Sequence, residues 1–161
     1  MTPETSDTTI VVGYDGSPAA HAAVEHAIDR AGPDGRLVIV SAWQVPIDYS
    51  GALYYPEMIG DASRDAESAL DALERDCERL GSVEFEREVA EGSAAATITR
   101  TAEAHEADEI VIGSRGVGRV RALLGSVAHD VIHLARCPVT VIPERMVDSR
   151  PATPAAADGA V

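Results

Sequence analysis

Short apolar runs rich in Val and Ile alternate along this chain with segments in which the apolar residues recur every three or four positions. The runs predict strands at residues 9–13, 36–43, 83–89, 109–113 and 139–143. The helical spacing predicts helices at about 18–31, 61–80, 93–106 and 126–136. The third run alternates apolar and charged residues, which indicates a half-exposed strand near a sheet edge.

The ends of these elements carry recognisable signals. Ser17 is a good helix N-cap, and Pro18 occupies the first helical position, where its missing N–H costs nothing. The Gly-Pro-Asp-Gly segment at 32–35 is a strong stop for the first helix. Residues 44–60 form a long connection with Pro and Tyr, which is typical of a flap or a partner surface.

The strict alternation of strand and helix predicts an α/β fold: a doubly wound, five-stranded parallel sheet with helices on both faces. In such sheets ligands bind beyond the carboxyl ends of the strands, where the winding reverses. The two loops that are chemically unusual follow the first and fourth strands. We therefore expect a binding site at that reversal.

These two loops offer groups suited to an adenine nucleotide. Asp15, just after the first strand, could accept a hydrogen bond from an adenine amine or a ribose hydroxyl. Gly113 and Gly116 would let the backbone approach phosphates, and Gly125-Ser126 opens the fourth helix, where backbone amides attract anions.

Arginine adds to this pattern, because Arg115, Arg119 and Arg121 cluster in a chain with excess acid and would steer an anion there. The alternative is structural: the glycines only turn the chain and the arginines are solvated. Two nucleotide motifs are excluded. A dinucleotide fingerprint belongs after the first strand, and a P-loop needs a lysine, which the sequence lacks.

Other candidates for chemistry are weaker. His129 and His133 share a helix face and superficially resemble a zinc-protease motif, but Asp130 replaces the glutamate base. No nucleophile elbow surrounds Ser126. His21 and His26 stand five residues apart and do not share a face well. We assign no catalytic residue and no metal ligand from the sequence.

The 161 residues are 45% hydrophobic, enough for one domain with a real core, and we assign 9–144 to it. Residues 1–8 are expected to be a flexible arm, and 145–161, rich in Ala and Pro, a disordered tail. Cys77 and Cys137 do not form a disulfide framework and suit a reducing compartment. With no long apolar segment, we expect a cytoplasmic protein that spans no membrane.

The formal charge of −14 and the absence of lysine disfavour binding to nucleic acid and to anionic membranes. This composition would suit the high-salt cytoplasm of a halophilic archaeon, because concentrated salt screens self-repulsion. The alternative is an acidic protein from an arginine-rich proteome.

The site residues carry a family resemblance. Gly113, Gly116, Gly125 and Ser126, followed by Val127, match the signature of the ATP-binding subgroup of the universal stress protein family. The opening segment 10–17, Glu91-Gly92 and Cys137-Pro138-Val139 also match, so the chain resembles this family over about residues 8–143. One departure is the spacing between Gly116 and Gly125, which is eight residues where the family pattern has nine.

The resemblance implies a sheet of order 3-2-1-4-5, an adenine nucleotide alpha-hydrolase-like fold, and a homodimer formed through the last strand, 139–143. It implies ATP, ADP or AMP as ligand, with Mg²⁺ or Mn²⁺ as an accompanying ion. By position, one group of residues would meet the nucleoside: Gly13, Tyr14, Asp15, Ser17, Ala42 and Ile112. The other group would meet ribose and phosphates: Gly113, Arg115, Gly116, Gly125, Ser126 and Val127.

The resulting hypothesis is a dimeric, nucleotide-responsive stress or signalling protein with an unknown protein partner. No catalytic base stands beside a phosphate lysine, so any ATP hydrolysis would be slow or partner-dependent. One alternative is a weak ATPase or phosphotransferase that uses Asp15 and a divalent ion. Another is a dimerisation module of the same family whose shortened loop no longer holds phosphates.

Overall fold

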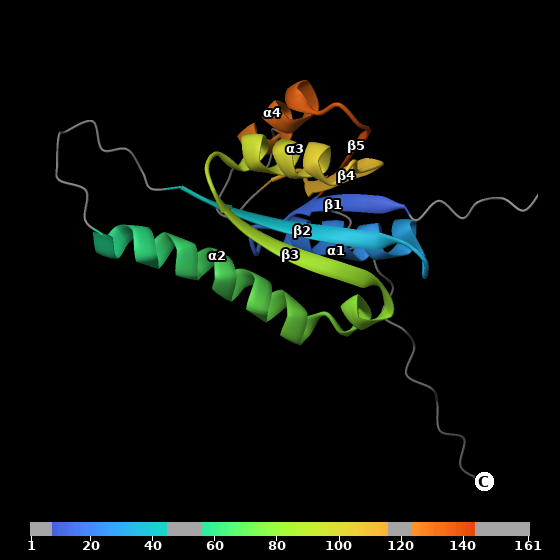
Figure 1. The fold of residues 1–161 in the computed structure, drawn as a ribbon, viewed down its shortest axis with the longest axis horizontal. Helices are drawn as coiled ribbons and strands as arrows, with labels where there is room; N and C mark the ends of the chain where they lie inside the picture. The colour runs from blue at the N-terminus through green and yellow to red at the C-terminus, as the bar shows by residue number, and fades with distance from the viewer. Residues whose placement is uncertain (1–7, 45–55, 116–123, 144–161) are drawn as a thin grey trace, which may run out of the picture.

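The computed structural model describes residues 8–44, 56–115 and 124–143. Strands and helices alternate throughout this part of the chain (Figure 1). In chain order the elements are β1 (Thr9–Gly13), α1 (Pro18–Ala31), β2 (Arg36–Trp43), α2 (Pro56–Asp76), the 3₁₀ helix η1 (Glu78–Ser82), β3 (Glu84–Glu91), α3 (Ala94–Ala104), β4 (Glu109–Gly113), α4 (Ser126–Leu134) and β5 (Val139–Ile142).

The strands form a five-stranded sheet in the order β3-β2-β1-β4-β5, and every neighbouring pair is parallel. Figure 1 shows α3 and α4 on one face of this sheet and α1 and α2 on the other. The predicted α/β fold, its strand order and its two helical layers are confirmed. The winding reverses between β1 and β4, so the loops that follow these two strands open at the same edge.

Alternating strand residues supply two separate cores. Ile10, Val12, Leu37 and Ile39 point toward α1 and α2, where Leu70 and Leu73 cover them. The intervening residues point toward α3 and α4, and they pack in a second cluster: Val11, Val38, Val40, Ile110 and Ile112. Burial on both faces explains why β1, β2 and β4 read as continuous apolar runs.

The outer strand β3 behaves as its alternating pattern predicts. It pairs only with β2, and its charged residues are largely exposed while Phe85 and Val89 pack against the first core. Arg87 lies 2.7 Å from Asp71 and 2.8 Å from Glu74, which ties this edge strand to α2.

The second helix differs from the prediction at both ends. It begins at Pro56, inside the segment expected to be a connection, and it ends at Asp76 rather than continuing to residue 80. The backbone leaves the α conformation at Cys77 (φ −105°, ψ 83°) before η1 begins. Cys77 and Leu80 are nevertheless buried, so the apolar periodicity continues through the break. For this reason the sequence pattern does not reveal where α2 ends.

The other differences are small and have local causes. Helix α4 ends at Leu134, two residues early, where Ala135 takes an extended backbone (φ −65°, ψ 144°). Strand β5 ends at Ile142, since Pro143 cannot donate to a ladder. Residues 1–7 of the predicted arm (1–8) and the whole predicted tail (145–161) lie outside the described residues. None of the helices described has the length and apolarity needed to cross a membrane.

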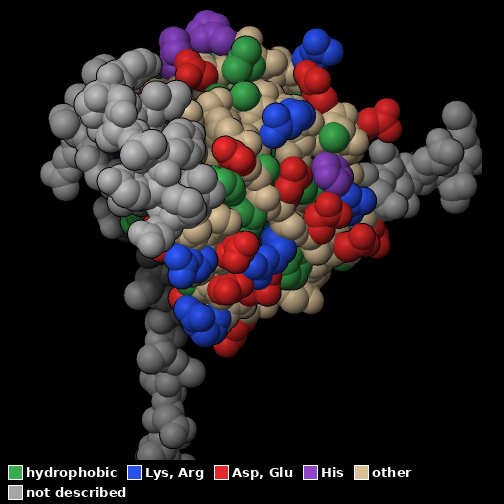
Figure 2. Space-filling view, turned by 60° about the vertical axis from the view of Figure 1, so that its left-hand side comes forward, with side chains coloured by type: hydrophobic (Ala, Val, Ile, Leu, Met, Phe, Trp, Pro, Cys, Tyr) green, Lys and Arg blue, Asp and Glu red, His purple; other side chains and the backbone are tan. Residues whose placement is uncertain are grey.

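The acidic surface is interleaved with arginine. Figure 2 shows red and blue side chains next to one another on the face that it presents. Ion pairs of this kind include Arg36 with Glu86, 3.1 Å apart, and Arg136 with Glu103, 3.2 Å apart. At these exposed positions each pair contributes at most about 1 kcal/mol, so the pairs relieve self-repulsion more than they hold the fold.

Candidate functional site

A cavity of about 360 Å³ lies beyond the carboxyl ends of β1, β2 and β4, at the reversal of the winding. We call it the site cavity. It is lined by Gly13, Tyr14, Asp15, Ala20, Val40, Ala42, Ala94, Ile98, Ile112, Gly113, Ser114, Arg115, Gly125, Ser126, Val127 and Ala128. Its volume is within the range of about 300–1,000 Å³ that is usual for small-molecule sites.

Most of the residues singled out in the sequence meet in this cavity. Those that line it are Gly13, Tyr14, Asp15, Ala42, Ile112, Gly113, Arg115, Gly125, Ser126 and Val127. Gly116, Arg119 and Arg121 lie outside the described residues. Ser17 is the exception among the described ones, because it does not line the cavity and is instead buried beneath its rim.

Ser17 holds the two loops together. Its hydroxyl accepts the N–H of Ala20 at 3.2 Å, which confirms Ser17 as the N-cap of α1, and it donates to the Arg115 carbonyl at 3.4 Å. Its own N–H donates to Asp15 Oδ1 at 3.0 Å. The first loop is thereby fixed to the start of the second, and Asp15 is held at the cavity mouth.

Tyr14 forms part of the cavity floor and is 7% exposed. Its N–H donates to the Val40 carbonyl at 2.8 Å, which extends the pairing of β1 with β2 by one residue. Burial is the main cause that raises the pKa of the Tyr14 phenol above its ordinary value of 10.0, and the nearby Asp15 and Asp76 carboxylates raise it further. The phenol is therefore neutral at physiological pH.

Two glycines at the strand ends leave no room for a side chain. A Cβ on Gly113 would stand 2.8 Å from the Ala19 carbonyl carbon and 2.9 Å from the Ala20 nitrogen. A Cβ on Gly13 would stand 2.6 Å from Ile98 Cδ1. Gly113 thus lets the first turn of α1 pack directly on the end of β4, which brings both loops to one mouth.

The helix α4 begins at the cavity, and its N-cap residue has no side chain that could cap the first turn. Its N-cap is Gly125, whose N–H donates to the Ser114 carbonyl at 2.8 Å. Ser126, Val127 and Ala128 follow, and the first N–H groups of a helix have no partner within the helix. The dipole of α4 and these donors make this side of the cavity favourable for an anion.

Sequence reasoning missed the apolar wall that α3 contributes. Ala94 and Ile98 reach the cavity from this helix, and Val40 and Ala20 complete the wall from β2 and α1. These positions carry no signal of their own, because a small or branched apolar residue on a buried helix face looks like core. Only the packing of α3 against the sheet turns them toward the cavity.

The ionisable residues in the described lining of the cavity are Tyr14, Asp15 and Arg115, and the Tyr14 side chain packs in the core on the α1–α2 face. One wall is apolar, and the opposite side offers backbone amides and the Ser126 hydroxyl. This arrangement can hold a flat apolar group at one end and an anion at the other.

The remaining candidates lie elsewhere. The rings of His129 and His133 meet edge to face with centroids 4.6 Å apart, so they share a helix face as their spacing predicts, and both residues are exposed. His21 was assigned no role in the sequence, yet it lies beside Glu25 and Cys77. The spacing of four residues between His21 and Glu25 on one helix was the feature of the sequence that could have predicted their proximity.

Comparison with known proteins gives a consistent answer. The model of the universal stress protein family matches residues 8–143. A universal stress protein of Thermus aquaticus is 34% identical over 139 residues, covering 83% of this chain and 97% of its own length. One of Mycobacterium tuberculosis is 34% identical over 140 residues, but this chain spans only 47% of it. The chain thus covers about half of that mycobacterial relative.

Solved structures agree with the sequences. A universal stress protein from Lactobacillus plantarum has a TM-score of 0.69 and 26% identity, covering 84% of this chain and 97% of its own. A universal stress protein in complex with cAMP has a TM-score of 0.55 and 25% identity, covering 87% and 99% of the two chains. Family model, sequence relatives and fold coincide, and this chain belongs to the universal stress protein family.

Proposed function

We propose that this chain is an adenine-nucleotide-binding member of its family, a dimeric module whose contacts with a partner depend on the bound nucleotide. The observation that carries the proposal is the site cavity, which gathers ten residues singled out for nucleotide binding at the reversal of the sheet. A related universal stress protein has been solved in complex with cAMP, which supports an adenine nucleotide as the ligand class.

The apolar side of the cavity suits an adenine base. Val40, Ile98 and Ile112 are almost fully buried and present branched side chains, while Ala42 leaves space beside them. A purine has two apolar faces and polar edges, so it gains by burial between such walls. Asp15 at the mouth supplies an acceptor for an amine or a ribose hydroxyl.

The α4 side suits the phosphates. The first turn of α4 offers N–H donors and the Ser126 hydroxyl, and Arg115 adds a positive charge within the same cavity. This site has backbone donors in place of a lysine. That composition favours a protein that retains its nucleotide over an enzyme that transfers phosphate rapidly. A divalent ion such as Mg²⁺ or Mn²⁺ would be held mainly by the phosphates themselves.

The test combines identification of the native ligand with a variant that fills the cavity. Native mass spectrometry of the purified full chain should show a bound adenine nucleotide, and calorimetry at high salt should rank ATP, ADP, AMP and cAMP. Ala42→Trp should abolish binding, because its side chain would occupy the base end. Ala96→Trp on the exposed face of α3 is the matched control and should bind normally. Unchanged affinity in Ala42→Trp would contradict the proposal.

The dimer rests on a separate observation. Leu124, Val127, Ile132 and Leu134 expose between 39% and 53% of their surface around α4, beside the edge strand β5. Exposed apolar side chains next to the outermost strand of the described sheet are a usual subunit interface. We assign the dimer contact to β5 and α4, and light scattering of the full chain at several concentrations tests it.

A further inference from the structure

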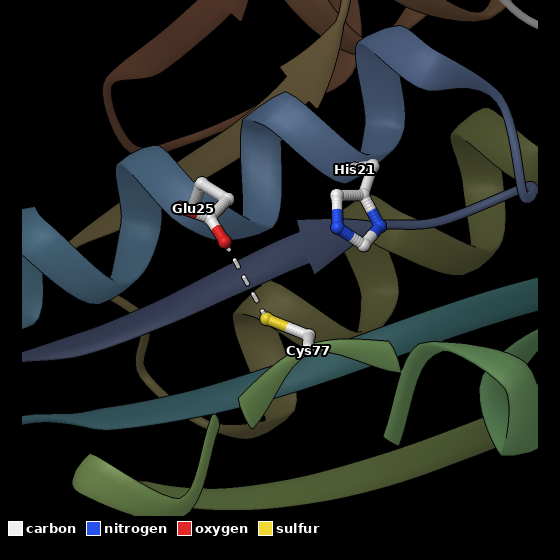
Figure 3. Close-up of side chains that lie close together, drawn as sticks. All are labelled: His21, Glu25 and Cys77. Atoms are coloured by element: carbon white, nitrogen blue, oxygen red, sulfur yellow. Dashed lines mark hydrogen bonds between the residues drawn. The ribbon is translucent and has the colours of Figure 1, made fainter. Parts of the chain in front are cut away.

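A mixed set of metal-binding side chains lies on the opposite face of the sheet from α3 and α4. His21 and Glu25 stand one turn apart on α1, and Cys77 occupies the break between α2 and η1 (Figure 3). One ligand atom from each residue lies within 4.8 Å of the other two. A nitrogen, a carboxylate oxygen and a sulfur thus converge from two elements far apart in the chain.

The distances are close to those of a tetrahedral site. Cys77 Sγ lies 3.6 Å from Glu25 Oε1, and the thiol donates its proton to that oxygen. With zinc–sulfur bonds of about 2.3 Å and zinc–oxygen bonds of about 2.0–2.2 Å, two tetrahedral ligands stand about 3.5–3.7 Å apart. The ligand atoms lie within 4.8 Å of one another, so the imidazole of His21 needs to approach by at most about 1.4 Å, which rotation of an incompletely buried side chain supplies.

The carboxylate is already oriented for this role. Arg79 Nη1 donates to Glu25 Oε2 at 2.7 Å, so the other oxygen, Oε1, faces Cys77. Arg79 also pairs with Asp29, which offsets the guanidinium charge. Outer-shell hydrogen bonds of this kind fix the ligands of metal sites and keep them in position.

A hollow beside the three side chains gives a metal ion a path to them and admits water as a fourth ligand. His21 and Glu25 line a hollow of about 950 Å³ between α1 and α2, which we call the α1–α2 groove, while Cys77 is buried beside it. Asp29 and Asp76 also line this groove and give it a negative character that attracts cations. Water can enter from the groove and complete the coordination.

We propose that His21, Glu25 and Cys77 bind one zinc-class divalent ion, with water as the fourth ligand. Binding exchanges the thiol proton for the ion: the Cys77 S–H bond breaks, a sulfur–metal bond forms, and one proton leaves to solvent. Sulfur and nitrogen ligands favour Zn²⁺ or Co²⁺ over Mg²⁺ and Ca²⁺. The site is separate from the site cavity and does not depend on a nucleotide.

The experiment titrates the metal-free, tag-free full chain with Co²⁺ in the absence of nucleotide. One equivalent should produce the near-ultraviolet thiolate-to-cobalt band and the strong visible bands of tetrahedral cobalt, and Zn²⁺ should remove both. Cys77→Ser should lose the thiolate band. His21→Ala should weaken binding by about 10-fold or more, because a ligand bond is lost. Mg²⁺ at the same concentration should have no effect.

Matched controls use the other potential ligands. Cys137→Ser, His26→Ala and His129→Ala should keep the spectrum of the unmodified chain. As a second measurement, Zn²⁺ should raise the urea concentration at the midpoint of unfolding of the unmodified chain but not of Cys77→Ser, because an ion bound to the native site stabilises the folded state. A cobalt spectrum without a thiolate band, or one that persists in Cys77→Ser, would overturn the proposal. So would Zn²⁺ that leaves the unfolding midpoint of the unmodified chain unchanged, and this readout needs no variant.

Discussion

Two substitutions of Asp15, by alanine and by asparagine, separate its support of the first loop from its contact with a ligand. Asp15 Oδ1 accepts the N–H of Ser17 at 3.0 Å, and the exposed remainder of the carboxylate lines the site cavity. Asp15→Ala removes both contacts. Asp15→Asn keeps an oxygen for Ser17 but removes the negative charge. The pair of variants therefore distinguishes support of the loop from contact with a ligand.

The magnitude follows from the kind of bond that is lost. A hydrogen bond to a charged group contributes about 1.5–3 kcal/mol, which corresponds to a change in Kd of about 10- to 150-fold. Asp15→Ala should weaken nucleotide binding by a factor in that range. Asp15→Asn should weaken it less, because its amide oxygen still accepts the Ser17 N–H and the loop keeps its shape.

Calorimetry with ATP at high salt measures the Kd, and urea unfolding of the same samples measures stability. Asp34→Ala is the matched control, since Asp34 is also exposed but lies in the turn before β2, at the other end of the strands. It should leave the Kd unchanged. If Asp15→Ala binds ATP as tightly as the unmodified chain, Asp15 is not a ligand contact and the assignment of the nucleoside end is wrong.

Three further outcomes test the fold, the buried phenol and the dimer. Gly113→Ala should lower the free energy of unfolding in urea by about 1–3 kcal/mol, because its Cβ meets the α1 backbone. Gly81→Ala, with open space around it, is the control, and equal stability of the two variants would contradict this packing. The raised pKa of Tyr14 means that the neutral phenol is favoured in the folded state, so its stabilisation is complete below pH 10.0 and is lost as pH rises through the folded-state pKa. Between pH 9 and 11 the free energy of unfolding should therefore fall more steeply for the unmodified chain than for Tyr14→Phe. Parallel pH dependences of the two free energies would count against a buried phenol. Ile132→Glu places a charge in the exposed apolar patch and should shift light-scattering mass toward the monomer, whereas an unchanged mass would exclude α4 from the interface.

The parts of the fold that were predictable depend on local patterns. Continuous apolar runs indicate strands buried on both faces, and Ser17-Pro18 marks the start of α1 through a cap that the structure confirms. Alternation of strand and helix then restricts the sheet to parallel pairing with right-handed crossovers. The position of the site at the reversal follows from that topology.

What could not be predicted depends on contacts between distant elements. Leu73, Cys77 and Leu80 keep one apolar stripe whether the backbone is α-helical or 3₁₀, so the end of α2 leaves no trace in the sequence. The meeting of Cys77 with His21 depends on that break. Likewise Ala94 and Ile98 become part of the cavity only because α3 packs where it does.

Tyr14 lines both the site cavity and the α1–α2 groove, so the two hollows share a wall. An occupant of either hollow that displaces Tyr14 changes the shape of the other. Any such effect is reciprocal: if a ligand in the groove alters nucleotide affinity by some factor, the nucleotide alters that ligand's affinity by the same factor. Tyr14, at the end of β1, is the residue through which such coupling between the two hollows would pass.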